Sequence, residues 1–250
     1  MAEAGHVTLA FDAAYQGASK GEPRQTDRPA NCVEDIRAGI DLLLTVKGVD
    51  ANHIGALGIY GGGGYTIEVS KSDKRIKAVA TISAFNTGRV RRNGFKDSQV
   101  DSILDRFNQA STARAKYATT GEVDYIGELL THRTHFTQEQ LDQIPAGLYR
   151  DGTQYYGDTH YHPNSQSRYT AMSLQDLMTF DAEDHAELIN QPLLRYFPTS
   201  CLGRLRSHFL SERTHDRVGG GGQRVPGGLS CTGHRVPDRR YPVIDGSEAR

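Results

Sequence analysis

The chain has 250 residues, a formal net charge of −1 and 24% charged residues. This composition is typical of a soluble globular protein and argues against a disordered chain. A nearly neutral chain has no electrostatic attraction to nucleic acid or to an anionic membrane, and we expect neither as a partner. The sequence also lacks a run of about 18 apolar residues, so no membrane-spanning helix is predicted.

The cysteines indicate a reducing compartment. Cys32, Cys201 and Cys231 are scattered along the chain, form no CxxC pair and are odd in number. An odd, scattered set does not fit a closed disulfide framework. The first residues do not show a basic segment followed by an apolar run, so no signal peptide is predicted. We therefore expect a cytoplasmic protein.

The first 82 residues alternate between strand-like and helix-like patterns. Residues 6–11 form a short apolar run that predicts a buried strand, and residues 31–44 place apolar side chains on one face of a helix. Residues 54–59 and 78–82 predict two further buried strands, with a helix over 65–75 between them. This alternation predicts parallel strands joined by helical crossovers, which is the α/β class.

Residues 86–190 are more polar and mostly helical in pattern, which predicts a helical cap inserted over the sheet. Helices are expected over 98–118, over 138–144 with Thr137 as the N-cap and Gln140 three residues later, and over 173–189. Residues 189–194 return to strand character. From 195 to 250 the chain has ten arginines and no lysine, and Gly and Pro are frequent, so we expect a poorly ordered tail after a first domain of residues 1–194.

A glycine-rich turn follows the strand predicted over 54–59. Gly58-Ile59-Tyr60-Gly61-Gly62 fits the pattern G-x-nucleophile-x-G, in which a sharp strand-to-helix turn exposes a nucleophile. The pattern predicts Tyr60 at the nucleophile position and the Gly61 N–H as a donor to an oxyanion. The same glycines could instead hold a phosphate at a helix N-terminus. That alternative is weaker, because no Lys-Ser/Thr pair follows and Thr66 breaks the GxGxxG spacing.

Several long segments resemble one protein family. FDAAYQGASKG, VDANHIGALGIYGGGGYT, DKRIKAVATISAFNTGRVRRNG and SLQDLMTFDAEDHAELINQPLL are similar to a bacterial branch of the dienelactone-hydrolase-like α/β-hydrolases, which itself resembles fungal polyketide transferases. The resemblance covers about residues 6–194. It implies a mostly parallel sheet of about eight strands, a Ser or Cys nucleophile on the elbow, and an Asp and a His on later loops. It also implies a partial fold, which begins at about the fourth strand and diverges after residue 194, so no triad Asp or His is identified.

The resemblance places Tyr60 where the family carries Cys or Ser. A phenol has a pKa near ~10 and a rigid ring, so it does not simply replace a thiolate or hydroxyl in a tight elbow. The resemblance also implies that the loop which supplies the second oxyanion N–H lies among the absent upstream strands, and loss of one such donor typically lowers the rate by ~10²–10³. The sequence therefore predicts a hydrolase-family protein whose ancestral reaction was acyl-transfer hydrolysis of an ester, lactone or thioester. With Tyr60 at the nucleophile position, we expect this protein to lack that hydrolase activity. The alternative is a non-catalytic pseudoenzyme, or the remnant of a damaged reading frame, with a binding role only.

We expect no cofactor and no metal. His132, His135, His160 and His162 have short spacings that metal sites also use, but no cluster of Cys or carboxylates completes such a site. We interpret these histidines as exposed or hydrogen-bonded. The expected partners are a small ester-like ligand and, through an open apolar edge of the sheet, a second copy of the chain.

Overall fold

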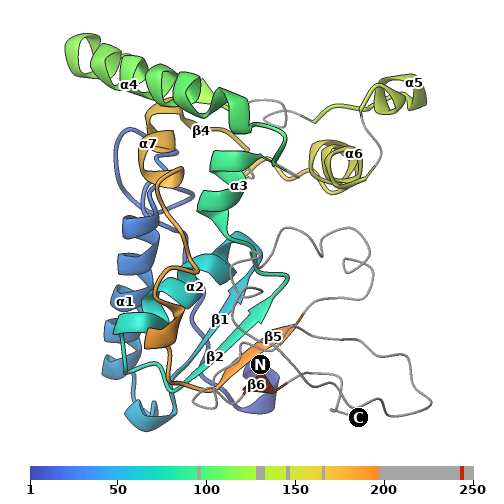
Figure 1. The fold of residues 1–250 in the computed structure, drawn as a ribbon. Helices are drawn as coiled ribbons and strands as arrows, with labels where there is room; N and C mark the ends of the chain where they lie inside the picture. Colours follow the sequence, from blue (N-terminus) through green and yellow to red (C-terminus); the bar gives the residue numbers. More distant parts are fainter. Residues whose placement is uncertain (95–96, 128–132, 145–146, 165–166, 197–242, 245–250) are drawn as a thin grey trace, which may run out of the picture. The chain divides into compact units, whose positions relative to one another are not determined.

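The computed structural model describes residues 1–94, 97–127, 133–144, 147–164, 167–196 and 243–244. The chain divides into two compact units (Figure 1). One, here the helical unit, comprises Met1–Asp35 and Gly88–Phe180, and the other, here the sheet unit, comprises Ile36–Thr87 and Asp181–Arg250. The predicted cap, residues 86–190, overlaps the Gly88–Phe180 segment, and its position over the sheet stays a prediction. The predicted tail, residues 195–250, lies almost wholly outside the described residues.

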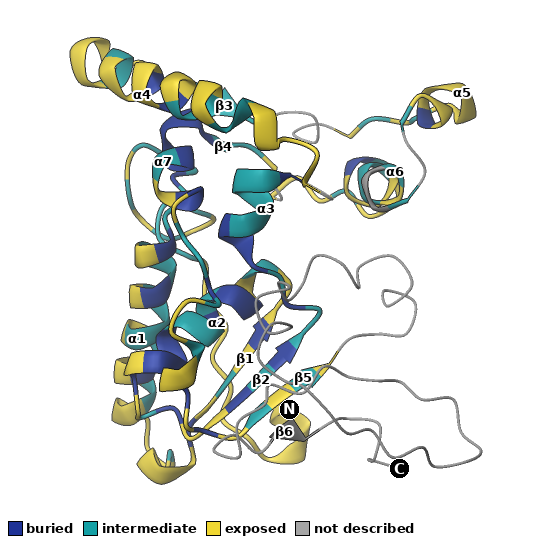
Figure 2. Ribbon diagram, viewed as in Figure 1, coloured by how far each residue is buried: buried dark blue, intermediate teal, exposed yellow. Residues whose placement is uncertain are grey.

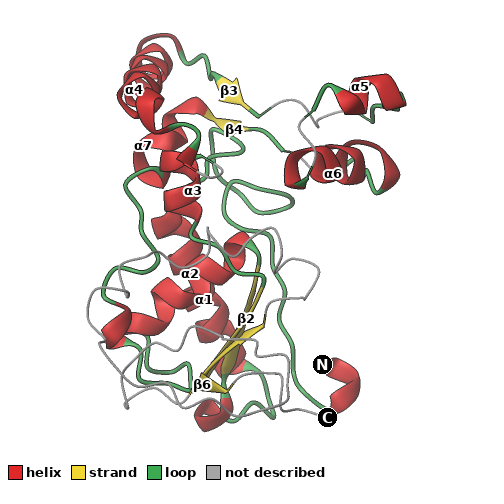
Figure 3. Ribbon diagram, turned by 45° about the vertical axis from the view of Figure 1, so that its right-hand side comes forward, coloured by secondary structure: helices red, strands yellow, loops and turns green. Residues whose placement is uncertain are grey.

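The sheet unit contains a parallel sheet, to which the yellow arrows labelled β2 and β6 in Figure 3 belong. Its strand order is β1-β2-β5-β6, and each neighbouring pair is parallel. The bounds are β1 Gly55–Ile59, β2 Ala78–Ile82, β5 Leu193–Tyr196 and β6 Val243–Ile244. Helix α2 (Gly61–Ser72) connects β1 to β2. The predicted α/β class is confirmed.

Burial alternates along β2, whose residues Figure 2 colours by burial. Val79 and Thr81 are only 2% and 1% exposed, and Thr81 lies against α2. Side chains alternate between the faces of a strand, so the register places the other set on the opposite face. There, four large apolar side chains are exposed: Leu57 (41%), Ile59 (60%), Leu194 (37%) and Tyr196 (49%). We call this set the open face.

Helix α1 (Pro29–Thr45) runs from the helical unit into the sheet unit, and its predicted amphipathic pattern is confirmed by buried Val33 and Ile40. The helical unit is built around α4 (Ile103–Thr120), which ends at Gly121 in a left-handed conformation (φ 75°). The core of this unit consists of Ala110, Leu174 and Met178, with Phe107 and Tyr169 among the partly buried residues around it.

The other elements of the helical unit are short. Thr137 accepts a hydrogen bond from the Gln140 N–H, and the Gln140 side chain accepts one from the Thr137 N–H, so the predicted N-cap is confirmed. The bounds are η1 Ala2–Ala4, α3 Thr87–Asn93, η4 Val100–Ser102, β3 Tyr125–Ile126, α5 Gln138–Asp142, α6 Leu148–Gln154, the π-helix Tyr155–Thr159, β4 Tyr169–Thr170, the 3₁₀ turn η7 Ala171–Ser173 and α7 Leu174–Leu177. β3 and β4 pair antiparallel. None of the described helices is long and apolar enough to cross a membrane.

Two predicted elements are wrong. Residues 6–11 form no strand, and Val7 and Phe11 are 53% and 49% exposed. A strand needs a neighbour for its backbone hydrogen bonds, and no described strand pairs with this segment. The helix predicted over 173–189 is only α7 followed by turns and a 3₁₀ turn at Ala186–Leu188. Asp181 accepts a hydrogen bond from the Glu183 N–H, a local bond that competes with helix formation, and His185 is left-handed (φ 56°).

Candidate functional site

The chain turns sharply at Tyr60. Strand β1 ends at Ile59, helix α2 begins at Gly61, and Tyr60 between them has φ 55° and ψ −122°. Positive φ is uncommon for a residue with a side chain and stores strain unless the surroundings fix it. The structure therefore places Tyr60 at a strained strand-to-helix turn of the kind that the glycine pattern predicts.

Three backbone hydrogen bonds fix this turn. The Tyr60 N–H donates to the Ile82 carbonyl at 2.9 Å. The Tyr60 carbonyl accepts from the N–H of Gly63 at 3.0 Å and from that of Phe85 at 3.3 Å. The turn is thus bonded both to its own helix and to the chain around the end of β2, which explains how the strained conformation persists.

Close backbone approach explains the glycines. A Cβ atom on Gly58 would lie 2.6 Å from the Gly63 Cα, and a Cβ on Gly63 would lie 2.3 Å from the Ala84 Cβ. Such distances are well inside carbon–carbon contact, so only glycine fits at these two positions. Gly62 differs, because a Cβ there would have no neighbour within 4 Å.

An aromatic pair lies at the turn. The ring of Tyr60, a residue that is 42% exposed, meets the ring of Phe85 edge-on, with centroids 4.6 Å apart and an interplanar angle of 72°. The Phe85 Cζ lies 3.4 Å from the position that a Gly61 Cβ would take. The two rings therefore flank the start of α2.

Two donors lie beside these rings. Gly61 is the first residue of α2, so its N–H has no acceptor within the helix and lies at the positive end of the helix dipole. The hydroxyl of Thr87 is buried and, among the described residues, has no hydrogen-bond partner. It lies 3.5 Å from the position of a Gly61 Cβ. Leaving a buried hydroxyl unpaired costs about 1–3 kcal/mol, so an acceptor atom of a ligand at this place would be stabilised. No sequence pattern pointed to Thr87.

The loop that carries Phe85 and Thr87 is held by Asn86. This side chain is only 3% exposed, and its Nδ2 donates to the Asp181 Oδ1 at 2.5 Å. Its Oδ1 accepts from the Ala182 N–H at 3.4 Å. The segment that begins at Asp181 thus fixes the loop after β2, and with it the walls of the turn.

A half-buried arginine lies in the same sheet. Arg195 on β5 is in register with Thr81 on β2, on the face that α2 covers. Burial lowers the pKa of the Arg195 guanidinium to about 10, and the charge of Glu183 opposes this shift only in part. Strand β5 therefore carries a charge at a position where a parallel sheet usually has an aliphatic side chain.

The predicted histidine set lies in the helical unit. His135 Nδ1 is 2.8 Å from the Asp158 Oδ1, His160 stacks on a tyrosine ring at 4.1 Å, and His162 Nδ1 accepts a backbone N–H at 3.2 Å. His132 lies outside the described residues. Over the described ranges, no group of three or more His, Cys, Asp or Glu is arranged to hold a metal ion.

No family model matches the chain. It is 33% identical to the uncharacterized protein YcjY of Escherichia coli (strain K12) over 249 residues, which cover 99% of this chain and 72% of YcjY. The chain belongs to the YcjY family. The chain is also 30% identical over 202 residues to the uncharacterized protein PA2218 of Pseudomonas aeruginosa, and this YcjY-family chain spans only about half (49%) of the length of PA2218.

Solved structures show the fold of this YcjY-family chain. The crystal structure of PA2218 aligns with a TM-score of 0.61 at 26% identity, over 75% of this chain and 57% of that one. DcsB, solved with its substrate analogue, aligns at 0.58 and 18% identity, and the α/β-hydrolase GrgF from Penicillium sp. sh18 at 0.57 and 16%. Each of these two alignments covers 75% of this chain and 60% of the other. The predicted partial α/β-hydrolase fold is confirmed.

Proposed function

We propose that the turn at Tyr60 is the elbow of an α/β-hydrolase acyl-transfer site, and that the chain as written binds an ester-like carbonyl without hydrolysing it. The proposed ancestral reaction is hydrolysis of an ester, lactone or thioester, of the kind that the resemblance to dienelactone-hydrolase-like enzymes implies. The observation that carries the proposal is the backbone of Tyr60, which has φ 55° and ψ −122° directly before α2. The α/β-hydrolase fold of GrgF supports it.

The residues at the turn can bind a carbonyl oxygen, but they do not supply an effective nucleophile. The carbonyl oxygen of a ligand would accept hydrogen bonds from two donors. One is the Gly61 N–H, which has no acceptor within α2, and the other is the Thr87 hydroxyl, which has no hydrogen-bond partner in the described part of the chain. Attack requires a bond from an oxygen or sulfur at position 60 to the carbonyl carbon, transfer of its proton to a base, and departure of the leaving group. Tyr60 carries a phenol, and a phenol in water has a pKa near ~10 and is a poor nucleophile at neutral pH.

A thiol placed at the turn tests this proposal. In Tyr60→Cys the helix N-terminus should lower the thiol pKa, and the Gly61 N–H should stabilise the developing oxyanion. The control is Ile59→Cys, one residue earlier on β1, where the native side chain is 60% exposed but precedes the turn. Both variants are treated with 4-nitrophenyl acetate, and acetylation is located by peptide mass spectrometry, which separates the new thiol from the native cysteines.

The unaltered protein should release 4-nitrophenol no faster than buffer. The thiol at position 60 should be acetylated at least about tenfold faster than the thiol at position 59, since only the former gains from the helix N-terminus. Turnover by the unaltered protein would refute the loss of hydrolysis. Equal acetylation at the two positions would refute the assignment of the elbow as an acyl-transfer site.

A further inference from the structure

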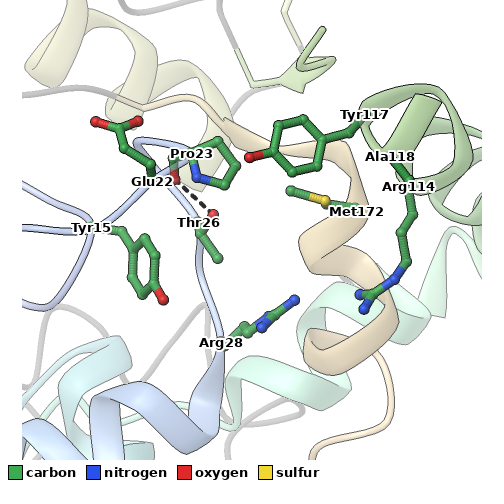
Figure 4. A pocket seen from close by; sticks show the side chains of 9 residues that line it. All are labelled: Tyr15, Glu22, Pro23, Thr26, Arg28, Arg114, Tyr117, Ala118 and Met172. Carbon is green, nitrogen blue, oxygen red and sulfur yellow. Dashed lines mark hydrogen bonds between the residues drawn. The ribbon is translucent and has the colours of Figure 1, made fainter. Parts of the chain in front are cut away.

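A pocket of about 290 Å³ lies within the helical unit, and its lining comes from this unit alone (Figure 4). The loop from Tyr15 to Arg28 forms one wall, and Tyr117 and Arg114 of α4 form another, with Met172 of η7 between them. The volume is at the lower end of small-molecule sites, so it suits a ligand of about ten non-hydrogen atoms.

Hydrogen bonds hold the loop in place. The Thr170 N–H donates to the Gln25 carbonyl at 3.0 Å, and the Asp27 N–H donates to the Ser173 hydroxyl at 2.9 Å. Thr170 and Ser173 are themselves buried and bonded to each other at 2.7 Å. A pocket whose wall is fixed in this way is formed before a ligand arrives, which lowers the entropy lost on binding.

Two guanidinium groups point into this space from opposite walls. Figure 4 shows the heads of Arg28 and Arg114 both directed at the lower part of the pocket, while the carboxylate of Glu22 points away from them. Arg28 has a partial counter-charge, since its Nε lies 2.9 Å from the Asp176 Oδ2. Arg114 contacts only the neutral Gln175 amide oxygen at 3.5 Å, and within the described residues no carboxylate reaches ion-pair distance from it. The pocket floor therefore carries positive charge that an anion would neutralise.

The remaining walls are apolar or aromatic. Pro23 and Met172 line the space between the two arginines and the ring of Tyr117, and the ring of Tyr15 lines the opposite side. Arginine binds a planar carboxylate through two parallel N–H donors, which a second guanidinium can supplement. We propose that this pocket binds a small monocarboxylate with a hydrophobic or aromatic body, its carboxylate on Arg28 and Arg114 and its body against Pro23 and Met172.

The experiment uses the full chain and benzoate as the probe, with saturation-transfer NMR titration as the readout. Benzoate should bind saturably with a Kd on the order of 1 mM, as expected for so few atoms. The neutral isostere benzamide should bind at least about tenfold more weakly, because it lacks the charge that the guanidinium groups recognise. Arg114→Gln should weaken benzoate at least about tenfold for the same reason.

A further variant separates this result from a change in folding. Lys116→Gln removes one positive charge from the same helix, but Lys116 is paired with Asp124 at 2.7 Å and does not line the pocket, so benzoate binding should be unchanged. Absence of saturable benzoate binding, equal affinity for benzamide, or unaltered binding to Arg114→Gln would each overturn the proposal. Tyr60→Cys should leave benzoate binding intact, because this pocket does not depend on the elbow.

Discussion

A methyl group added at Gly63 should destabilise the protein, whereas one added at Gly62 should stabilise it. At Gly63 the new Cβ would lie 2.3 Å from the Ala84 Cβ and 2.9 Å from the Ala84 Cα, against an optimum of about 3.5–4.0 Å. Because the nearer obstacle is a short side chain on fixed backbone, relief requires α2 and the loop after β2 to separate. Overpacking of this kind costs about 1–3 kcal/mol or more, while Gly→Ala in a helix contributes about 1 kcal/mol in the opposite direction.

The neighbouring position gives a matched control. Gly62 lies in the same helical turn, is exposed, and has no atom within 4 Å of an added Cβ, so Gly62→Ala should raise stability by about 0.5–1 kcal/mol. Gly63→Ala should lower it by about 2 kcal/mol, which separates the two variants by roughly 3 kcal/mol. Urea unfolding followed by far-UV circular dichroism measures this difference, provided that the slope m is unchanged.

Ala84 supplies the internal check. If the clash is the cause, Ala84→Gly should destabilise less in the Gly63→Ala background than in the unaltered protein, because it removes the nearer of the two obstructing atoms. A difference below about 1 kcal/mol between Gly63→Ala and Gly62→Ala, or strict additivity with Ala84→Gly, would show that α2 does not pack against the loop as closely as described.

Three further predictions concern the sheet. Arg195→Leu should raise the free energy of unfolding at neutral pH by about 1–3 kcal/mol in a thermal or urea melt. The pKa of Arg195 is lowered to about 10, so the folded state holds the proton less tightly than the unfolded state. The charge therefore destabilises the fold below that pH and ceases to do so as the pH rises above it. Arg195→Lys, which keeps a charge, should gain less stability than Arg195→Leu, and no gain in stability for Arg195→Leu would contradict a buried guanidinium. Thr81→Val should add about 1 kcal/mol, since the Thr81 hydroxyl is buried with no hydrogen-bond partner in the described residues, and a loss above that size would mean that the hydroxyl is bonded. We also propose that the open face and the edge strand β1 drive self-association, so the unaltered chain should sediment as a concentration-dependent oligomer. Ile59 is the most exposed of the four side chains of the open face (60%), and Ile59→Lys should shift the protein toward monomer. Identical sedimentation of the two proteins would exclude this surface as the interface.

Two strands of the sheet were predictable because local signals mark them, whereas the strand predicted over 189–194 overlaps β5 (Leu193–Tyr196) only at residues 193 and 194. The apolar run 78–82 coincides with β2, and the run 54–59 differs from β1 by one residue. Helix α2 was predicted to begin at residue 65 but begins at Gly61. Glycine has a low helix propensity, so a pattern based on propensity starts the helix too late. Here the close contact of Gly63 with Ala84 selects glycine, and tertiary packing overrides the local preference.

Only part of the candidate site could be predicted from the sequence. Tyr60 and Gly61 stand within a recognisable glycine pattern, so their place at the turn could be predicted. Phe85 and Thr87 could not be predicted, because they reach the turn from the end of a different strand, and no local sequence pattern marks their contact with position 61. The apolar run 6–11 shows the converse failure, since a strong local strand pattern forms no strand where no described neighbour accepts its hydrogen bonds.

The geometry of the turn does not depend on which side chain stands at position 60. Gly58 and Gly63 set the approach of strand and helix, and backbone bonds to Ile82, Gly63 and Phe85 hold the positive φ, none of which uses the Tyr60 ring. A tyrosine has no chemical need for this strained conformation, yet it adopts φ 55°. The surrounding backbone therefore imposes the strain, and Tyr60→Cys should inherit the turn unchanged. It follows that a thiol at position 60 that is acetylated no faster than one at position 59, while Gly63→Ala and Gly62→Ala behave as predicted, would refute the acyl-transfer assignment although the turn itself is formed as described.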